Sequence, residues 1–259
     1  MASKTVLLKQ ENGIGWIRFN RPEKLNALNS QVFKELEEAV AACEEADEIR
    51  VVILTGSEKA FVAGADIDQM ADADVTDAAR LGEISMRAQE RLAYLAKPTI
   101  AMISGYALGG GLEVALCCDF RIAADNAVLG LPEITLGIIP GGGGTQRLSR
   151  LISYSNAAEL IMTGEMIKAD QAEKLGILNR VVDPGALEDE VKAFASKLIK
   201  QPAMALRAAK TAMRRGLEVS LKDGLYIEQD CFCMLFSTAD QKEGMKAFME
   251  KRKPLFKGC

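Results

Sequence analysis

Two glutamates in apolar surroundings are the side chains of this sequence best suited to acid–base chemistry. Glu113 lies within the segment LEVAL at 112–116, and Glu133 lies within GLPEI at 130–134. Burial among apolar neighbours raises a carboxyl pKa toward neutrality, where the group can both take up and release a proton. A structural role is also open at this point, because a glutamate near a helix start often accepts hydrogen bonds from backbone N–H groups.

The absence of histidine from the sequence narrows the chemistry further. It excludes Ser–His and Cys–His nucleophilic pairs and every metal site that uses an imidazole ligand. Acid–base work must then fall to Asp, Glu, Lys, Tyr or Cys. None of the six cysteines forms a CxxC pair, so we expect ordinary thiols rather than a disulfide framework. They are Cys43, Cys117, Cys118, Cys231, Cys233 and Cys259.

Two glycine-containing turns lead into helices close to the candidate acids. They are AGADI at 63–67 and GYALGGGLE at 105–113. Unpaired N–H groups at a helix N-terminus favour an oxyanion, although such glycines more often serve a tight turn. A helix that begins at Gly110 would place Gly110 and Glu113 on one face, toward the same small volume. The motifs GxxxxGK[ST], GxGxxG and GxSxG do not occur, so nucleotide binding and a serine-hydrolase elbow are not supported.

The elements that must position these groups alternate between strand and helix over the first two thirds of the chain. A hairpin at Asn12-Gly13 joins the first two expected strands, Ser30 is expected to cap the first long helix, and Pro98 should end the third helix. Strands are expected at 5–10, 14–19, 50–55, 99–104, 120–123 and 178–182. Helices are expected at 30–47, 66–70, 75–96, 112–118, from about 145, and at 156–163, 168–175, 187–199, 203–215, 219–235 and 239–250. The pattern predicts a layered α/β core followed by a helical C-terminal part, with no evident internal repeat.

The composition favours an acidic globular protein with a large core. Hydrophobic residues make up 49% of 259 residues, and the net charge is −4. This charge gives no electrostatic footprint for nucleic acid, and no apolar run is long enough for a membrane span. The first five residues, MASKT, lack the apolar core of a signal peptide, so we expect a cytoplasmic protein.

Five motifs in order resemble the crotonase (enoyl-CoA hydratase/isomerase) family, and within it the short-chain enoyl-CoA hydratases. The resemblance covers essentially the whole chain and ends at EKRKP, residues 250–254. The motifs are NRPEKLNAL at 20–28, FVAGADI at 61–67, GGGLE at 109–113, PE at 132–133 and PGGGGTQRL at 140–148.

The resemblance implies an α/β fold of the crotonase type, a spiral of ββα repeats. Residues 1–195 would form the spiral core with a CoA-thioester site, and residues 196–259 a helical oligomerisation region of a homotrimer or homohexamer. The implied reaction is the reversible hydration of short-chain trans-2-enoyl-CoA, with a preference for C4 to C6 acyl chains. Coenzyme A is part of the substrate, and no metal or other cofactor is implied.

The resemblance also assigns roles to individual residues. The backbone N–H groups of Ala65 and Gly110 match the oxyanion hole, and Glu113 and Glu133 match the two catalytic glutamates. We assign water activation mainly to Glu113 and proton delivery to substrate C2 mainly to Glu133. The implied CoA contacts are Lys24, Leu25, Ala27, Ala63, Gly64, Ala65, Asp66, Ile67 and Gly110. Basic residues near the C-terminus, Lys253 and Lys257, would approach the CoA phosphates of a neighbouring subunit.

The sequence departs from the family pattern at one position, and three other functions must be weighed against hydration. Leu131 stands where many hydratases have Gln before the Pro-Glu pair, which would alter hydrogen bonding or acyl fit. A family isomerase is the nearest alternative, and the presence of both glutamates favours hydration. RNA binding is disfavoured because the helix expected at 30–47 is rich in Glu and has Lys34 as its single Lys. A catalytically silent assembly protein is disfavoured by the same two glutamates.

Overall fold

A six-stranded sheet forms the centre of the computed structural model, which describes residues 4–258. Residues 1–3, in the segment expected from its sequence not to be a signal peptide, and Cys259 lie outside the described residues. The sheet has the order β1-β2-β3-β5-β7-β10, with β1 and β2 antiparallel and the other pairs parallel. The strands are β1 (Val6–Glu11), β2 (Ile14–Phe19), β3 (Val51–Thr55), β5 (Thr99–Ile103), β7 (Phe120–Ala124) and β10 (Arg180–Val182). The expected hairpin at Asn12-Gly13 is confirmed, and both residues have positive φ.

A second, four-stranded sheet was not predicted from the sequence. Its order is β4-β6-β8-β9, and its strands are β4 (Ala60–Val62), β6 (Tyr106–Leu108), β8 (Val128–Gly130) and β9 (Met166–Lys168). Strands β4, β6 and β8 each follow a strand of the large sheet, namely β3, β5 and β7. The chain therefore repeats a unit of one long strand, one short strand and a helix, and this is the ββα repeat that the family resemblance implied.

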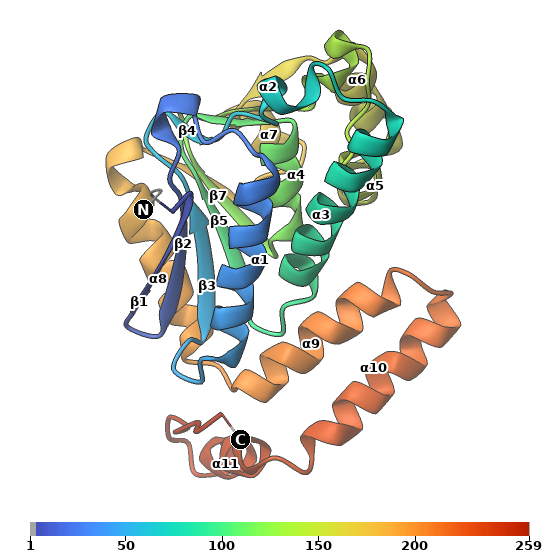
Figure 1. Ribbon diagram of the computed structural model, residues 1–259. Coiled ribbons are helices and arrows are strands. Elements are labelled where there is room, and N and C mark those ends of the chain that lie inside the picture. Colours follow the sequence, from blue (N-terminus) through green and yellow to red (C-terminus); the bar gives the residue numbers. More distant parts are fainter. Residues whose placement is uncertain (1–3, 259) are drawn as a thin grey trace.

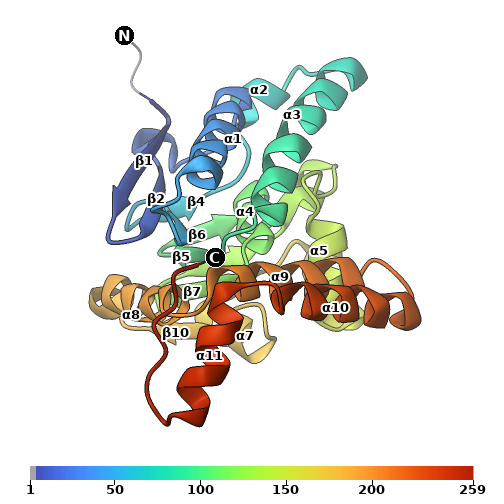
Figure 2. The same ribbon diagram turned by 90° about the horizontal axis from the view of Figure 1, so that it is seen from below.

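Helices cover both faces of the large sheet (Figures 1 and 2). Helices α1 (Ser30–Glu45) and α3 (Val75–Tyr94) pack together on one side, and α8 (Leu187–Ile199) packs on the other against β3, β5 and β7. Helix α4 (Gly110–Cys117) is almost fully buried. Asn29, rather than the expected Ser30, caps α1, because its side-chain oxygen accepts the Val32 N–H at 2.9 Å. The remaining core helices are α2 (Ile67–Met70), α5 (Gly144–Leu151), α6 (Tyr154–Thr163), α7 (Ala169–Lys174) and the short 3-10 helices η1 (Pro22–Lys24), η2 (Pro132–Leu136) and η3 (Pro184–Ala186).

Three C-terminal helices form an arm that projects from the core (Figures 1 and 2). They are α9 (Ala203–Gly216), α10 (Leu221–Leu235) and α11 (Ala239–Met249). The boundary expected between residues 195 and 196 falls inside α8, and the division of the chain into two functional parts stays a prediction. No helix within residues 4–258 is long and apolar enough to cross a membrane.

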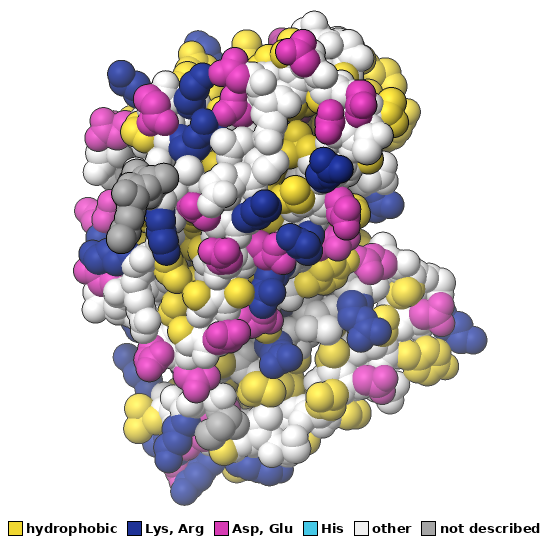
Figure 3. Space-filling model, in the orientation of Figure 1, with side chains coloured by type: hydrophobic (Ala, Val, Ile, Leu, Met, Phe, Trp, Pro, Cys, Tyr) yellow, Lys and Arg dark blue, Asp and Glu magenta, His cyan; other side chains and the backbone are white. Residues whose placement is uncertain are grey.

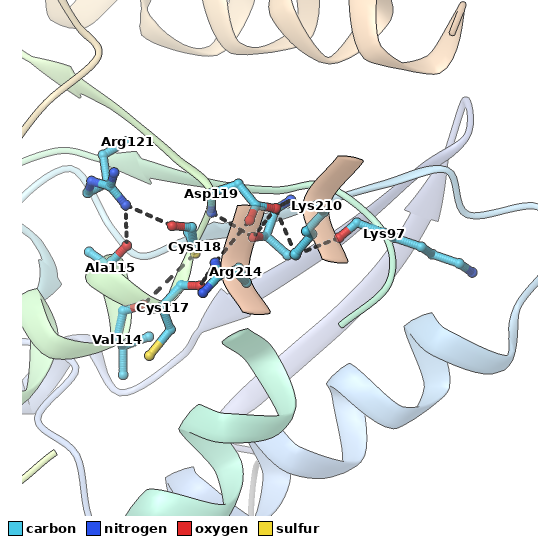
Figure 4. A network of polar contacts seen from close by, with 10 residues as sticks. Lys97, Val114, Ala115, Cys117, Cys118, Asp119, Arg121, Lys210 and Arg214 are labelled. Carbon is cyan, nitrogen blue, oxygen red and sulfur yellow. Dashed lines mark hydrogen bonds and ion pairs between the residues drawn. The ribbon is translucent and has the colours of Figure 1, made fainter. Parts of the chain in front are cut away.

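A partly buried ion-pair network fastens the arm to the core (Figure 4). The Asp119 carboxylate, just before β7, accepts from Lys210 Nζ at 2.8 Å and Arg214 Nη2 at 2.9 Å, both on α9. The same carboxylate accepts the backbone N–H and hydroxyl of Thr99, which holds it at the end of β5. Because two partly buried cations share this carboxylate, its loss would leave both without their acidic partner.

Candidate active site

The N-terminus of α4 is built on the small sheet. Gly109, with φ +50°, ends the turn after β6 and donates its N–H to the Gly130 carbonyl on β8 at 2.9 Å. A Cβ at Gly111 would overlap the carbonyl oxygen of Val62 on β4, so only glycine allows the helix to approach this closely. The short strands thus fix where α4 begins and leave Gly110 partly exposed at its first turn.

The backbone N–H of Ala65 faces the same volume as Gly110. Leu28 bridges the loop on both sides of Ala65, donating to the Gly64 carbonyl at 2.9 Å and accepting the Asp66 N–H at 2.7 Å. These two bonds use Gly64 and Asp66 but not the Ala65 N–H, which has no backbone acceptor within residues 4–258. A Cβ at Gly110 would lie 4.0 Å from the Ala65 nitrogen and 3.9 Å from Glu113 Oε2. The structure therefore places Ala65, Gly110 and Glu113 close together.

Glu113 is held at the N-terminus of the following helix. Glu113 is only 4% exposed, and its Oε1 accepts the N–H groups of Gly142 at 2.8 Å and Gly144 at 2.7 Å. Burial raises the pKa of Glu113, while the two N–H donors and the positive charge of Arg147 counteract part of that rise. The N-cap residue of α5 is Gly143, which has no side chain, so Glu113 supplies the missing acceptor from another helix.

Glu133 lies opposite, in the first turn of η2. Its Oε1 would be 2.7 Å from a Cβ at Gly109, which places the carboxyl group beside the start of α4. Its Oε2 is buried and has no hydrogen-bond partner among residues 4–258. Burial raises the pKa of Glu133 to about 7, and the nearby charge of Glu113 contributes to the rise. A carboxyl group with this pKa exchanges protons readily at neutral pH.

Most of the predicted CoA-contacting residues belong to two adjoining segments of the chain, 24–27 and 63–67. The Ala63 N–H donates to the Leu25 carbonyl at 3.0 Å, so the loop after β2 lies against the loop after β4. The side chains of Lys24 and Asp66 are already engaged, by Asp68 at 2.6 Å and by Arg21 at 2.8 Å. Of the remaining members of the set, Ala27 and Gly64 belong to the same two loops, and Ile67 is the first residue of α2.

The basic residues of the C-terminal tail are placed elsewhere. Lys253 and Lys257 follow α11 on the arm, at the opposite end of the molecule from α2 (Figure 1). The backbone N–H of Lys257 donates to the Asp240 carboxylate at 2.7 Å, which holds the tail against α11. They do not approach the site of their own subunit, and contact with a neighbouring subunit stays a prediction.

Several residues around the site had no role in the sequence-based prediction. The amides of Gly142 and Gly144 and the guanidinium of Arg147 all belong to the motif PGGGGTQRL, which was noted only as a family signature. Asn26, buried with φ +62°, donates to the carbonyls of Ala60 and Phe61 and so ties the first loop to β4. The buried side chain of Leu131 lies 3.0 Å from the Cβ position of Gly144, where Glu113 Oε1 also lies at 3.0 Å.

Comparison with known proteins settles the family. A family model described as enoyl-CoA hydratase/isomerase matches residues 9–259. The chain belongs to this family. Both the resemblance stated from the motifs and the crotonase-type fold are thereby confirmed.

Members of the enoyl-CoA hydratase/isomerase family align with this chain over nearly its full length. The short-chain-enoyl-CoA hydratase of Clostridium acetobutylicum is 44% identical, over 98% of this chain and 97% of the relative. The crotonyl-CoA hydratase of Syntrophomonas wolfei is 42% identical, over 99% of each. The solved structure of an enoyl-CoA hydratase from Bacillus anthracis has a TM-score of 0.94 at 40% identity, covering 98% of this chain and 100% of that one.

Proposed function

We propose that this protein is an enoyl-CoA hydratase that adds water reversibly to short-chain trans-2-enoyl-CoA thioesters. The observation that carries the proposal is the meeting of two glutamates with raised pKa values and two available backbone N–H groups at the start of α4. Relatives of similar length, at 44% and 42% identity, are named as short-chain-enoyl-CoA and crotonyl-CoA hydratases.

The N–H groups of Ala65 and Gly110 would receive the thioester oxygen. When water attacks C3, the electron pair of the C2=C3 bond moves toward C2 and negative charge develops on that oxygen. Two fixed donors stabilise this charge more in the transition state than in the ground state. Removal of one such donor costs roughly 3–4 kcal/mol in comparable oxyanion holes.

The two glutamates divide the proton transfers according to their surroundings. Glu113 keeps Oε1 bonded to two amides, which leaves Oε2, the oxygen nearer to Gly110, to take a proton from water. Glu133, with a pKa of about 7, is the group that gives a proton to C2. The hydroxyl goes to C3 and the proton to C2, so the product is the 3-hydroxyacyl thioester. The two carboxyl groups interact, so their protonation states change as a pair.

We further propose a C4 to C6 chain preference, a homotrimeric or homohexameric assembly and a role in fatty acid degradation in the cytoplasm. The names of the relatives support the chain length. Exposed apolar side chains on the arm support the assembly. No cofactor enters the proposed reaction, because every proton and electron pair comes from water, the substrate and the two glutamates.

Assays on two substrates test hydration against the isomerase alternative. The purified protein is given crotonyl-CoA, and loss of the conjugated enoyl absorbance is followed. In parallel, a 3-enoyl-CoA is given, and gain of that absorbance reports double-bond migration. We expect rapid hydration, with kcat/KM falling from C4 to C16 substrates. Migration without hydration, or a maximum at C10 or longer, would contradict the proposed activity or the chain length respectively.

A further inference from the structure

Arg147 lies behind the glycine loop that holds Glu113. It occupies the first turn of α5, and its Nη1 folds back to donate to the Gly142 carbonyl at 2.6 Å. The guanidinium occupies the space where a Cβ at Gly143 would stand, so it lies directly on the loop. Gly142 and Gly144, on either side of that contact, are the residues whose N–H groups reach Glu113 Oε1.

The loop consists of glycines, which have no side chains of their own to restrict its conformation. Gly143 adopts φ +101°, and Gly141 and Gly142 precede it, so four consecutive glycines must hold a defined conformation. Glycines lose more backbone freedom on ordering than any other residue. A side chain that bonds to the middle of the loop therefore restricts the directions in which its N–H groups can point. The Arg147 guanidinium is the side-chain donor that fills this position.

Arg147 forms no ion pair with another residue among residues 4–258. Among residues 4–258, no carboxylate oxygen lies within ion-pair distance of this half-buried guanidinium, although acidic residues line the same cavity between core and arm. Of these, Asp119 binds Lys210 and Arg214, and Glu218 accepts the Tyr94 hydroxyl. The field of the arginine is thus available to act on Glu113.

Arg147 is the cation whose charge favours the ionised form of Glu113. Glu133, on η2, is kept protonated more readily by burial and by the charge of Glu113, so it supplies no cation to Glu113. Cys117, on α4, stays a neutral thiol because burial raises its pKa to about 11, and Gln89, on α3, is uncharged. The Arg147 charge lowers the pKa of Glu113 against the effect of burial.

We propose that Arg147 is a positioning residue for the hydration reaction: it fixes the glycine loop at 141–144 so that two amides hold Glu113 as an ionised base. This inference rests on the proposed hydratase function. It assigns no substrate contact to Arg147, because its guanidinium bonds to the Gly142 carbonyl, whereas the Gly142 N–H bonds to Glu113.

Three substitutions separate the hydrogen bond from the charge. Arg147→Met removes both, and we expect kcat to fall at least about tenfold with KM for crotonyl-CoA unchanged within about twofold. Arg147→Gln keeps a donor for Gly142 but no charge, so the acidic limb of kcat/KM should move to higher pH by about half a unit or more. Arg147→Lys keeps the charge, so its acidic limb should stay at the wild-type pH while kcat falls.

The matched control is Arg150→Met, which removes an arginine from the same helix. Among residues 4–258, the hydrogen bonds of its guanidinium go to the backbone and side chain of Gln146. It should leave kcat and the acidic limb unchanged. Circular dichroism reports whether each variant folds; if Arg147→Met does not, the Gln and Lys variants decide. The proposal is overturned if the Arg147 variants match Arg150→Met in kcat and pH profile, or if their loss is in KM.

Glu113→Gln, measured in parallel, separates this inference from the proposed function. If wild-type protein does not hydrate crotonyl-CoA, or if Glu113→Gln still does, the hydratase mechanism fails. If Glu113→Gln abolishes hydration while the Arg147 variants behave as wild type, only the positioning role of Arg147 fails.

Discussion

The two glutamates of the site carry the proposed proton transfers, and this role predicts the effect of substituting either of them. Glu113→Gln and Glu133→Gln keep shape and one hydrogen-bond acceptor but cannot exchange a proton at neutral pH. We expect each to lower the hydration kcat about 10²- to 10⁴-fold, with KM little changed because neither removes the Ala65 or Gly110 N–H. The double variant should be little worse than the weaker single one, because the groups act in one step.

Steady-state kinetics on crotonyl-CoA measure these effects, with Glu159→Gln, an exposed glutamate on α6, as the control. Near-wild-type hydration by either single variant would exclude the two-carboxylate mechanism. In an isomerase, one of the two substitutions would leave the rate of double-bond migration nearly unchanged.

The raised pKa values also predict the pH dependence of hydration. Glu133 must be protonated to give its proton to C2, and its pKa is about 7, so kcat/KM should fall as the pH rises above that value. Glu113 must be ionised to accept a proton, so kcat/KM should also fall on the acidic side, at a pH above the usual carboxyl range because its pKa is raised. A pH profile of kcat/KM measures both limbs. A rate that stays constant well above neutral pH would show that Glu133 is not the acid.

At the scale of the elements, Glu113 joins two helices, since it lies on α4 and caps α5. Glu113→Ala should therefore leave the N–H groups of Gly142 and Gly144 without an acceptor, whereas Glu113→Gln keeps one. We expect the Ala variant to have a free energy of unfolding about 1–3 kcal/mol lower than that of the Gln variant. Urea unfolding of both variants gives the difference, and Ser153→Ala, at the ordinary N-cap of α6, calibrates the effect of a local cap. Equal stability of the Ala and Gln variants would mean that Glu113 does not cap α5.

The strands of the large sheet and the long helices could be predicted from the sequence, and the strands of the small sheet could not. The run 50–55 and the helix at 75–96 carry enough apolar residues to reveal their periodicity, and both match elements of the structure. Strands β4, β6, β8 and β9 have three residues each, which is too few for an alternating pattern, and their partners are distant in sequence. These short strands fix the start of α4, so the position of Gly110 beside Ala65 was predicted from the family motifs and not from periodicity.

The bonds from Gly142 and Gly144 to Glu113 could not be predicted from the sequence for a related reason. A cap is expected from a side chain adjacent in sequence, and Asn29 and Ser30 are both plausible caps for α1 by this rule. The acceptor for α5 comes instead from Glu113, about thirty residues away along the chain. Contacts of this kind depend on the packing of α4 against α5, which no local pattern of residues encodes.

At the scale of the whole molecule, the arm leaves many apolar side chains uncovered. Figure 3 shows hydrophobic side chains along it, between charged ones, on the face turned to the viewer. The exposed residues of α10 and the arm's last helix include Leu221, Leu225, Phe232, Met234, Phe248 and Met249. So many exposed large apolar side chains on a few helices are typical of protein–protein interfaces. The anchoring of α9 by Asp119 holds the arm at a fixed place on the core, as an interface between copies requires.

The last prediction concerns this surface. We expect the protein to sediment at micromolar concentration as a multiple of its 28.0 kDa chain, with a trimer as the smallest stable species. Phe248→Asp places a charge on a side chain that is 84% exposed in the single subunit and would be buried between copies, so it should shift the distribution toward smaller species. Val75→Asp is the control, because Val75 is 87% exposed at the start of α3 on the core and lies away from the arm. Sedimentation velocity of the three proteins distinguishes the outcomes. A wild-type monomer would reject self-association, and a Phe248→Asp protein that sediments as the wild type would place the interface elsewhere than on α11.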